Sequence, residues 1–308
     1  MRKKSLENWC GALMTMRWVE ISDHPQLQRF QTLAHFLNET GLENEVIFLK
    51  ATKQDFPEIV AKAEQEFDQI RIGGSLCQYV TEISIRLPSL LLSLKAGDAL
   101  VQKARKPNLP DWWPRNFLVD GIVRALVTDK RSLDLSGAVF LLGAGCESRA
   151  AVAALVRLGF QRFSISCSDD ITGQALVEEL RTLYFQVQFQ FIPRHLITQL
   201  PSIHSIAINT LVAGHDDEAL NELFYFNFLK PGGIWLDLAF VGNQHLENEA
   251  RAVGAETAEG IRVAAWTDYE WAQEVLLIKL DPDALTDRYR AVFSPAELAS
   301  TPRPHTED

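Results

Sequence analysis

The sequence predicts an α/β protein in which helices cover both faces of a parallel sheet. From residue 139 onward, short apolar stretches alternate regularly with longer segments of helical periodicity. Several of the short stretches are apolar throughout, which is typical of strands buried on both faces. The chain has 308 residues, 47% of them hydrophobic, which is enough for two domains with separate cores.

The first half of the chain shows the same alternation less regularly. Residues 107–114 contain three prolines, which cannot lie inside a helix, so this stretch is predicted to be a loop. Helices are predicted over residues 26–38 and 55–67, strands over 46–49 and 70–72, mostly helical structure over 76–103 with a break at Pro88, and a helix after Gly121.

The second half follows a strand–helix rhythm almost without interruption. Strands are predicted over residues 139–142, 163–166, 187–191, 205–208 and 233–237, and helices over 147–158, 171–183, 217–228, 243–253 and from about 262. The residues from 295 to 308 are polar and rich in proline, so we expect a flexible tail there.

Composition excludes several classes of function. The net charge of -10 disfavours binding to nucleic acid or to an anionic membrane surface. No apolar run reaches the ~18 residues of a membrane span, and no secretory signal is evident, so we expect a cytoplasmic protein. The four cysteines are far apart and the histidines are scattered, which predicts reduced thiols and no metal site.

A glycine motif between a predicted strand and a predicted helix is the sharpest local signal. Gly143 would make the tight turn, and Gly145 would let the backbone approach a pyrophosphate. Ser148 is the small residue that allows helix and strand to pack closely, and the helix start offers N–H groups to phosphates. This pattern predicts a Rossmann-type nucleotide-binding domain. A glycine turn that binds nothing is the alternative, and a carboxylate at Glu147 would repel a phosphate.

The next strand ends in two carboxylates, Asp169 and Asp170. A carboxylate there can accept hydrogen bonds from the adenosine ribose and would repel a 2′-phosphate, and no Arg or Lys lies within residues 166–170. If a dinucleotide binds, we therefore expect NAD rather than NADP. Alternatively, Asp169 only caps the following helix, and both roles are compatible.

Residues 139–150 resemble the strand and GAGGASRA turn of the shikimate dehydrogenase family. Further similarities occur in the same order along the chain, most clearly from residue 118 to residue 278. They are Asp120-Gly121 with the family's NTDG segment, Asn209 and Gly214 with its NATxxG loop, residues 231–237 with its PG…D strand, and Gly260 with the start of its closing helix.

The resemblance implies the domain order of that family. We expect an N-terminal α/β substrate-type domain over residues 1–121 and a Rossmann NAD(P)-binding domain over 122–260. A C-terminal helical segment, residues 261–294, would return to the first domain. The activity implied is that of a dehydrogenase acting on a CH–OH group. The residues it implies at the cofactor are Gly143, Ala144, Gly145, Ser148, Arg149, Asp169, Asn209 and Gly214.

The implied catalytic site is only partly present. Asp120 matches the family's catalytic Asp, although it could instead be the N-cap of a helix starting at Gly121. Ser75 or a neighbour stands where the catalytic Lys is expected. Lys95, Arg71 or His24 could replace that base, and we select Lys95 as the candidate. The alternative is that Lys95 is only a solvent-exposed lysine on a helix.

Other substrate positions also depart from the family. Asp23 lies where a substrate carboxylate should bind, Thr267 replaces the Gln of the closing helix, and Phe240 replaces a Tyr. We therefore expect a substrate other than shikimate, whose identity the sequence leaves open.

Two hypotheses of function follow. The first is a divergent oxidoreductase that uses NAD(H). The second is a non-catalytic module that keeps the fold and binds a nucleotide, a second copy of itself as a homodimer, or a protein partner. Trp112 and Trp113, in the predicted proline-rich loop, would be a contact site or would fold back onto the domain. Nicotinamide binding discriminates between the two hypotheses.

Overall fold

The computed structural model describes residues 15–84, 86–106, 109–128, 132–211, 226–240 and 242–293. The chain divides into two compact units. The first runs to Leu87 and includes Gly97–Arg115, and the second comprises Pro88–Ala96 and the chain from Asn116 onward. No helix within the described ranges is long and apolar enough to cross a membrane.

The first unit is built on a five-stranded sheet in the order β2-β1-β3-β4-β5. Strand β1 is parallel to β2 and β3, whereas β4 is antiparallel to β3 and β5. The fully buried Trp18 anchors the core and meets Phe30 edge-on at 5.5 Å. Its elements are β1 (Met16–Ser22), α1 (Leu27–Glu39), β2 (Asn44–Lys50), α2 (Phe56–Glu66), β3 (Gln69–Gly73), the 3-10 helix η1 (Gly74–Tyr79), α3 (Val80–Ile83), β4 (Ala99–Lys106) and β5 (Leu109–Arg115).

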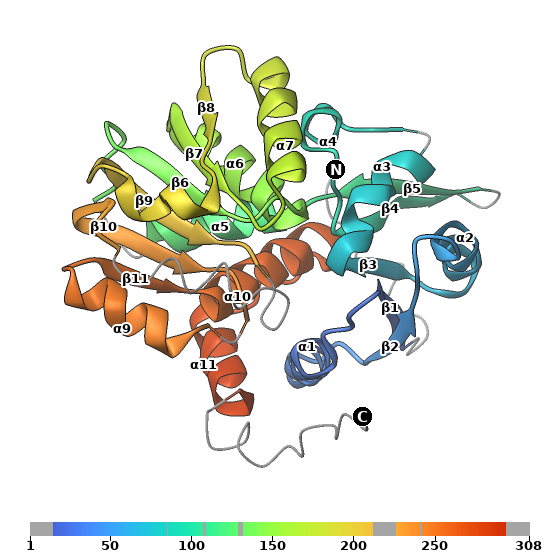
Figure 1. Ribbon diagram of the computed structural model, residues 1–308. Helices are drawn as coiled ribbons and strands as arrows, with labels where there is room; N and C mark the ends of the chain where they lie inside the picture. The colour runs from blue at the N-terminus through green and yellow to red at the C-terminus, as the bar shows by residue number, and fades with distance from the viewer. Residues whose placement is uncertain are drawn as a thin grey trace, which may run out of the picture. The chain divides into compact units, whose positions relative to one another are not determined.

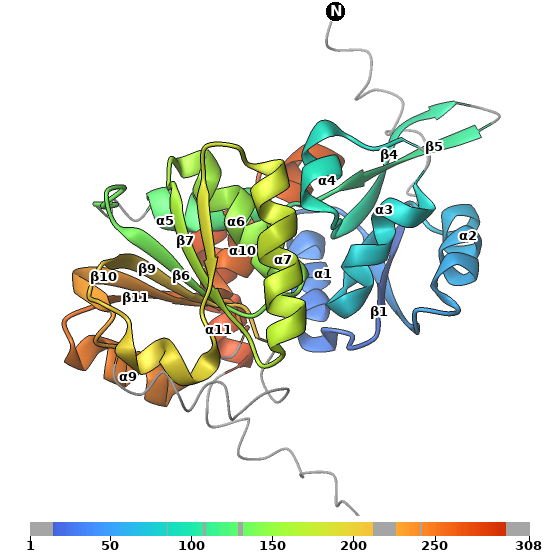
Figure 2. The same ribbon diagram turned by 45° about the horizontal axis from the view of Figure 1, so that its top comes forward.

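Two predictions for this unit are wrong. Residues 109–114 of the proline-rich stretch lie in strand β5 rather than in a loop, because β5 is an edge strand in which a proline need not donate to the ladder, and residues 107–108 lie outside the described residues. Residues 99–103, expected to be mostly helical, belong to β4 and pair with β5 in the hairpin visible in Figure 2. A short apolar stretch such as Ala99–Val101 fits a strand or a buried helix equally well by periodicity. Strand β1 was not predicted.

The second unit contains a six-stranded sheet, and every pair of neighbouring strands is parallel. The order β11-β10-β9-β6-β7-β8 is that of a doubly wound dinucleotide-binding sheet, which confirms the predicted fold class. The order reverses between β6 and β9, and ligands of such sheets bind outside the carboxyl ends of the strands at this point. The strands are β6 (Ala138–Leu142), β7 (Arg162–Ser166), β8 (Gln188–Phe191), β9 (His204–Asn209), β10 (Leu229–Asp237) and β11 (Glu256–Glu259).

Helices α6, α7 and α9 begin and end within one residue of their predicted bounds, whereas the one helix predicted from about residue 262 is divided into α10, a π-helical turn and α11. Figures 1 and 2 show α6 and α7 running side by side. Residues 217–225 of one predicted helix lie outside the described residues, and 226–228 form a turn before β10. The helical segments are α4 (Ser89–Leu94), α5 (Leu118–Thr128), α6 (Cys146–Leu158), α7 (Asp170–Leu183), η2 (Arg194–Gln199), α9 (Gln244–Ala252), α10 (Gly260–Trp271), a π-helical turn (Ala272–Leu276) and α11 (Pro282–Val292).

Helix α10 packs against α5 within the second unit. The contact is so close that a Cβ atom on Gly121 would lie 2.1 Å from Thr267 Oγ1. A glycine at this position therefore lets the two helices approach. That the last helices also return to the N-terminal domain stays a prediction.

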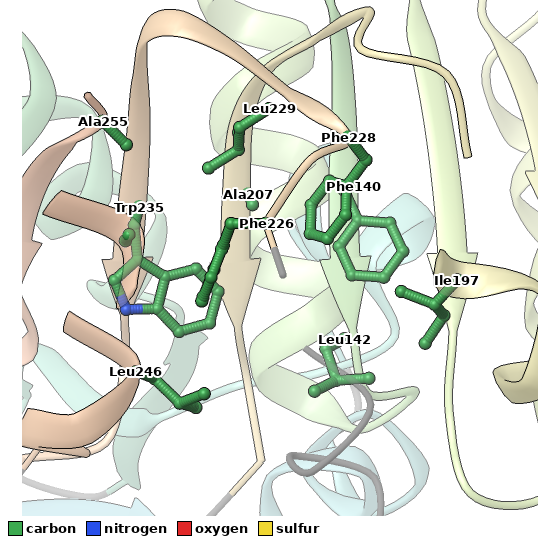
Figure 3. Packing of buried hydrophobic residues seen from close by; sticks show 11 residues of the cluster. Phe140, Leu142, Ile197, Ala207, Phe226, Phe228, Leu229, Trp235, Leu246 and Ala255 are labelled. Atoms are coloured by element: carbon green, nitrogen blue, oxygen red, sulfur yellow. The ribbon is translucent and has the colours of Figure 1, made fainter. Parts of the chain in front are cut away.

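A cluster of buried apolar residues fills one face of the second sheet (Figure 3). Trp235 of β10 lies edge-on to Phe226 at 4.8 Å, and Phe140 of β6 lies 4.8 Å from Phe228. Leu246 of α9 closes the cluster from outside the sheet. The alternate residues of β6 face the other side and are equally buried, so helices must cover both faces, as predicted.

Candidate nucleotide-binding site

The turn after β6 requires a glycine. Gly143 has φ +117°, and its N–H donates to the Ser166 carbonyl across the sheet at 2.7 Å. A Cβ atom on Gly143 would lie 2.3 Å from Thr210 Oγ1. Both the backbone conformation and the close approach to β9 therefore exclude a side chain, as the fingerprint predicts.

Gly145 is a glycine for a different reason. It is exposed and has φ -84°, a value that any residue adopts. Within the described part of the chain, a Cβ atom there would come within 4 Å of one atom outside the adjacent residues, Glu147 Oε2, at 3.3 Å. The fold itself therefore does not require a glycine at position 145. The missing side chain leaves open space beside the glycine loop. Ala144 beside it is half-buried.

The start of α6 is suited to an anion. Gly145 is the N-cap, and as a glycine it has no side chain with which to cap the helix. A helix start with uncapped N–H groups attracts phosphates and carboxylates. Gly145 and the first turn of α6 therefore stay the predicted position of a pyrophosphate.

Ser148 is buried beneath the glycine turn and stabilises it through a hydrogen bond. It is fully buried, and its hydroxyl lies 2.6 Å from Thr210 Oγ1. The Thr210 hydroxyl in turn donates to the Leu142 carbonyl at 2.8 Å. Ser148 therefore joins α6, β6 and the end of β9. In this arrangement it shapes the loop, whereas its predicted contact with a cofactor stays a prediction.

Asp169 caps α7. Its carboxylate accepts hydrogen bonds from Ile171 N at 3.2 Å and Thr172 N at 3.1 Å, and from the Thr172 hydroxyl. The hydrogen bonds from Thr172 lower the pKa of Asp169 below its ordinary value. Asp169 therefore does cap α7. The side chain is also exposed at the carboxyl end of β7, and its hydrogen bonding to the adenosine ribose stays a prediction.

The ends of β9 and β10 are joined by a buried pair. Asn209 Nδ2 donates to Asp237 Oδ1 at 2.9 Å, and Asn209 Oδ1 accepts from Leu211 N at 3.1 Å. Asp237 also accepts from Ala239 N and Asn243 N, both at 3.0 Å. Burial nevertheless raises the pKa of Asp237, because desolvation outweighs these hydrogen bonds. The pair therefore holds the backbone of Leu211 after β9 and of Ala239 and Asn243 after β10, while Gly214 lies outside the described residues.

Asp120 forms an ion pair with Arg157 at 2.5 Å. It is the third residue of α5, which begins at Leu118, so Asp120 is not the N-cap considered above. Asn116 is closer to that role, since its side chain accepts from Val119 N at 3.2 Å. Arg157 lies near the C-terminal end of α6. It is eleven residues after Cys146, the first residue of the helix, which corresponds to about 16 Å along the helix axis.

Lys95 ends α4 in the left-handed conformation, with φ +51°. Its ammonium lies 2.7 Å from Glu179 Oε1, and Arg149 Nη2 lies 2.7 Å from Glu179 Oε2. Burial raises the pKa of Glu179, but the two cations outweigh burial and lower it overall. Lys95 and Asp120 therefore have separate partners, and no ion pair among the described residues joins them.

Arg149, expected at the cofactor, reaches across to α7 in this arrangement. Its side chain is 18% exposed and holds Glu179 in the middle of that helix. The sequence gives no local sign of this contact, because the two residues are 30 positions apart. Glu179 is thus a structural residue that sequence reasoning missed.

In the first unit, the loops after β1 and β3 meet through Asp23 and Ser75. Ser75 donates to the Asp23 carboxylate through its backbone N at 3.2 Å and its hydroxyl at 2.5 Å. Ser22 is buried and accepts from His24 N at 3.0 Å. Arg71 is buried under Phe30, 5.2 Å from the ring centre. These loops therefore present an acidic group.

Two other expected substrate positions serve packing. The Thr267 hydroxyl donates to Val263 O at 2.8 Å within its own helix, and Phe240 packs against Tyr289 and Phe293 at 5.1 and 4.4 Å. Within the described residues, no group of three or more His, Cys, Asp or Glu could hold a metal.

Trp112 and Trp113 lie in β5, not in a loop, and both are half-buried. The Arg86 guanidinium lies 5.9 Å from the Trp113 ring centre. The tryptophans thus belong to the sheet of the first unit, and their role in binding a partner stays a prediction.

No model of a known protein family matches the chain, and no curated protein matches its sequence. Solved structures do match its fold. Quinate dehydrogenase from Corynebacterium glutamicum in complex with NAD is 18% identical with a TM-score of 0.75, and the match covers 90% of this chain and 99% of that one. Shikimate 5-dehydrogenase from Thermus thermophilus in complex with NADP(H) and shikimate is 17% identical with a TM-score of 0.73, covering 91% and 100%.

A third match is the ligand-free 5-ketofructose reductase of a Gluconobacter species, 15% identical with a TM-score of 0.74, covering 92% of this chain and 100% of that one. At these identities the similarity lies in the fold. The match extends over nine-tenths of the chain, including both units. The protein therefore has a shikimate dehydrogenase-like fold.

Proposed function

We propose that this protein is an oxidoreductase that binds NAD(H) in preference to NADP(H) and transfers hydride at a CH–OH group of a substrate other than shikimate. The observation that carries the proposal is the loop of Gly143 and Gly145. It lies where the strand order reverses, and it leads into the start of α6, whose N-cap is Gly145.

The preference for NAD(H) rests on the end of β7. Asp169 and Asp170 are both exposed there, and the stretch 166–170 contains no cation to pair with a 2′-phosphate. Proteins of this fold include a quinate dehydrogenase bound to NAD and a shikimate 5-dehydrogenase bound to NADP(H). The fold therefore permits either cofactor, and local charge must select between them.

The altered substrate rests on the first unit. The carboxylate of Asp23, held by Ser75, would repel a substrate carboxylate, whereas it can accept hydrogen bonds from hydroxyl groups. One protein of this fold is a 5-ketofructose reductase. A neutral polyol or its ketone is thus a better candidate than a hydroxy acid.

A non-catalytic nucleotide-binding module is the second candidate. It is favoured by the ion pairs of Asp120 with Arg157 and of Lys95 with Glu179. A proton relay needs its groups within hydrogen-bond reach of one reacting atom, and these contacts hold the two residues on different partners.

The first experiment is a calorimetric titration of the full chain with NAD, NADH, NADP and NADPH, with thermal shift as a second readout. A ligand that binds only the folded state raises the melting temperature. We expect NAD(H) to bind at micromolar concentration and NADP(H) at least about tenfold more weakly, given the charge at Asp169. If none of the four binds at millimolar concentration, the proposal is refuted.

Two variants locate the site. Gly145→Val fills the space above the loop and should abolish NAD binding while the protein stays folded. Ala252→Val, at an exposed position at the end of α9, is the matched control for added bulk. If NAD binds, oxidation of neutral polyols compared with cyclic and 2-hydroxy acids separates the two candidates and tests the substrate class.

A further inference from the structure

The glycine loop already holds a negative charge of its own. Glu147 is the second residue of α6, and its Oε2 atom lies 3.3 Å from the point where a Cβ atom on Gly145 would be. Among the residues that the structure describes, no other atom comes within 4 Å of that point apart from Gly145 itself and its two chain neighbours. The space that the missing side chain of Gly145 provides is therefore bordered by a carboxylate.

This position favours the carboxylate for the same reason that it favours a phosphate. The first turn of a helix carries a partial positive charge, and an acidic side chain placed there is stabilised. A pyrophosphate approaching Gly145 would seek the same helix start. It would also be repelled by a like charge a few ångströms away.

We propose that Glu147 sets the affinity and the charge selectivity of the glycine loop. The Glu147 carboxylate must turn away from Gly145 before a dinucleotide binds, so the charge of Glu147 lowers the affinity of the loop for phosphate-containing ligands. This inference rests on the proposed function, because it assumes that the loop receives a nucleotide.

The test compares the wild-type protein with Glu147→Gln, which keeps the shape of the side chain and removes its charge. Removing a like charge at this distance should tighten binding of NAD and of ADP-ribose about tenfold at 0.1 M salt. Adenosine, which has no phosphate, should bind equally to both proteins. If Glu147 acted only on folding, the substitution would change the affinities for all three ligands by a similar factor.

Salt provides an independent readout. The screening length falls from about 10 Å at 0.1 M to about 3 Å at 1 M, so the tenfold advantage of Glu147→Gln should shrink to less than about threefold. Glu256→Gln, at an exposed position in β11, is the matched control and should bind like the wild type. Glu147→Ala should give the same order of affinities if the Gln variant is poorly folded.

The failures of the two proposals are distinguishable. If the wild type binds NAD and both Glu147 variants bind it no more tightly, the role of Glu147 is overturned while the proposed function stands. If neither the wild type nor the variants bind any of the phosphate-containing ligands at millimolar concentration, both proposals are overturned.

Discussion

Neutralising Glu179 should destabilise the second unit, because its carboxylate forms two ion pairs. It holds Lys95 and Arg149 at 2.7 Å each, and it is itself only 22% exposed. The Lys95 pair is worth about 0.5 kcal/mol, because the lysine is half-exposed. Arg149 is 18% exposed, so leaving its guanidinium without a charged partner should cost about 1.5 kcal/mol more.

Glu179→Gln is therefore expected to lower the free energy of unfolding by about 2 kcal/mol at pH 7. For a domain of this size, that corresponds to a fall of about 4–8 °C in the melting temperature. Urea denaturation and thermal unfolding measure both quantities. Glu178→Gln is the matched control, since Glu178 is 71% exposed and pairs only with Arg181 among the contacts described. Its effect should stay within about 0.5 kcal/mol.

The pH dependence gives a second check. The pKa of Glu179 is lowered in the folded protein, so its contribution is present above the ordinary value of 4.5 and is lost as pH falls through the folded value. The difference between wild type and Glu179→Gln should therefore vanish under acidic conditions. A Glu179→Gln variant as stable as Glu178→Gln at pH 7 would refute the reasoning.

Three further changes test the site. Gly143→Ala should lower the free energy of unfolding by about 2–4 kcal/mol, because the alanine would have an unfavourable positive φ and would clash with Thr210. An unchanged free energy of unfolding would mean that the turn is not tight. Asp237→Ala should cost about 3 kcal/mol, since Asn209 and two loop N–H groups lose a buried acceptor, and equal urea midpoints would contradict this. Asp169→Ala should cost about 1 kcal/mol through the lost α7 cap and should raise NADP affinity in calorimetry; unchanged NADP affinity would show that Asp169 is not the selector.

Local patterns were sufficient to predict five of the six strands of the second sheet. These strands are short stretches that are apolar or alternate apolar with polar residues, and the turn at Gly143 lies directly between one of them and an apolar helix. The sixth, β11, was missed because its sequence from Glu256 to Glu259 is mostly polar. Strand β1 was missed for a related reason, since the fully buried Glu20 interrupts its apolar pattern.

The contacts of the candidate site could be predicted only in part. Capping by Asp169 depends on the next three residues, so sequence spacing sufficed. The partners of Lys95, Asp120 and Arg149 lie 30 or more positions away, and only the packing of α4, α5, α6 and α7 brings them together. Side chains with the chemistry of catalysis or phosphate binding are therefore held in ion pairs that no local pattern indicates.

The prolines of β5 have a consequence for how copies of the chain can meet. An edge strand with free N–H and C=O groups is a template on which another chain can add a strand, leading to fibres or aggregates. Pro110 and Pro114 of β5 lack the donor that such pairing needs. We expect this border of the sheet to resist strand addition, so any homodimer should form through side-chain packing elsewhere rather than through a continuous sheet.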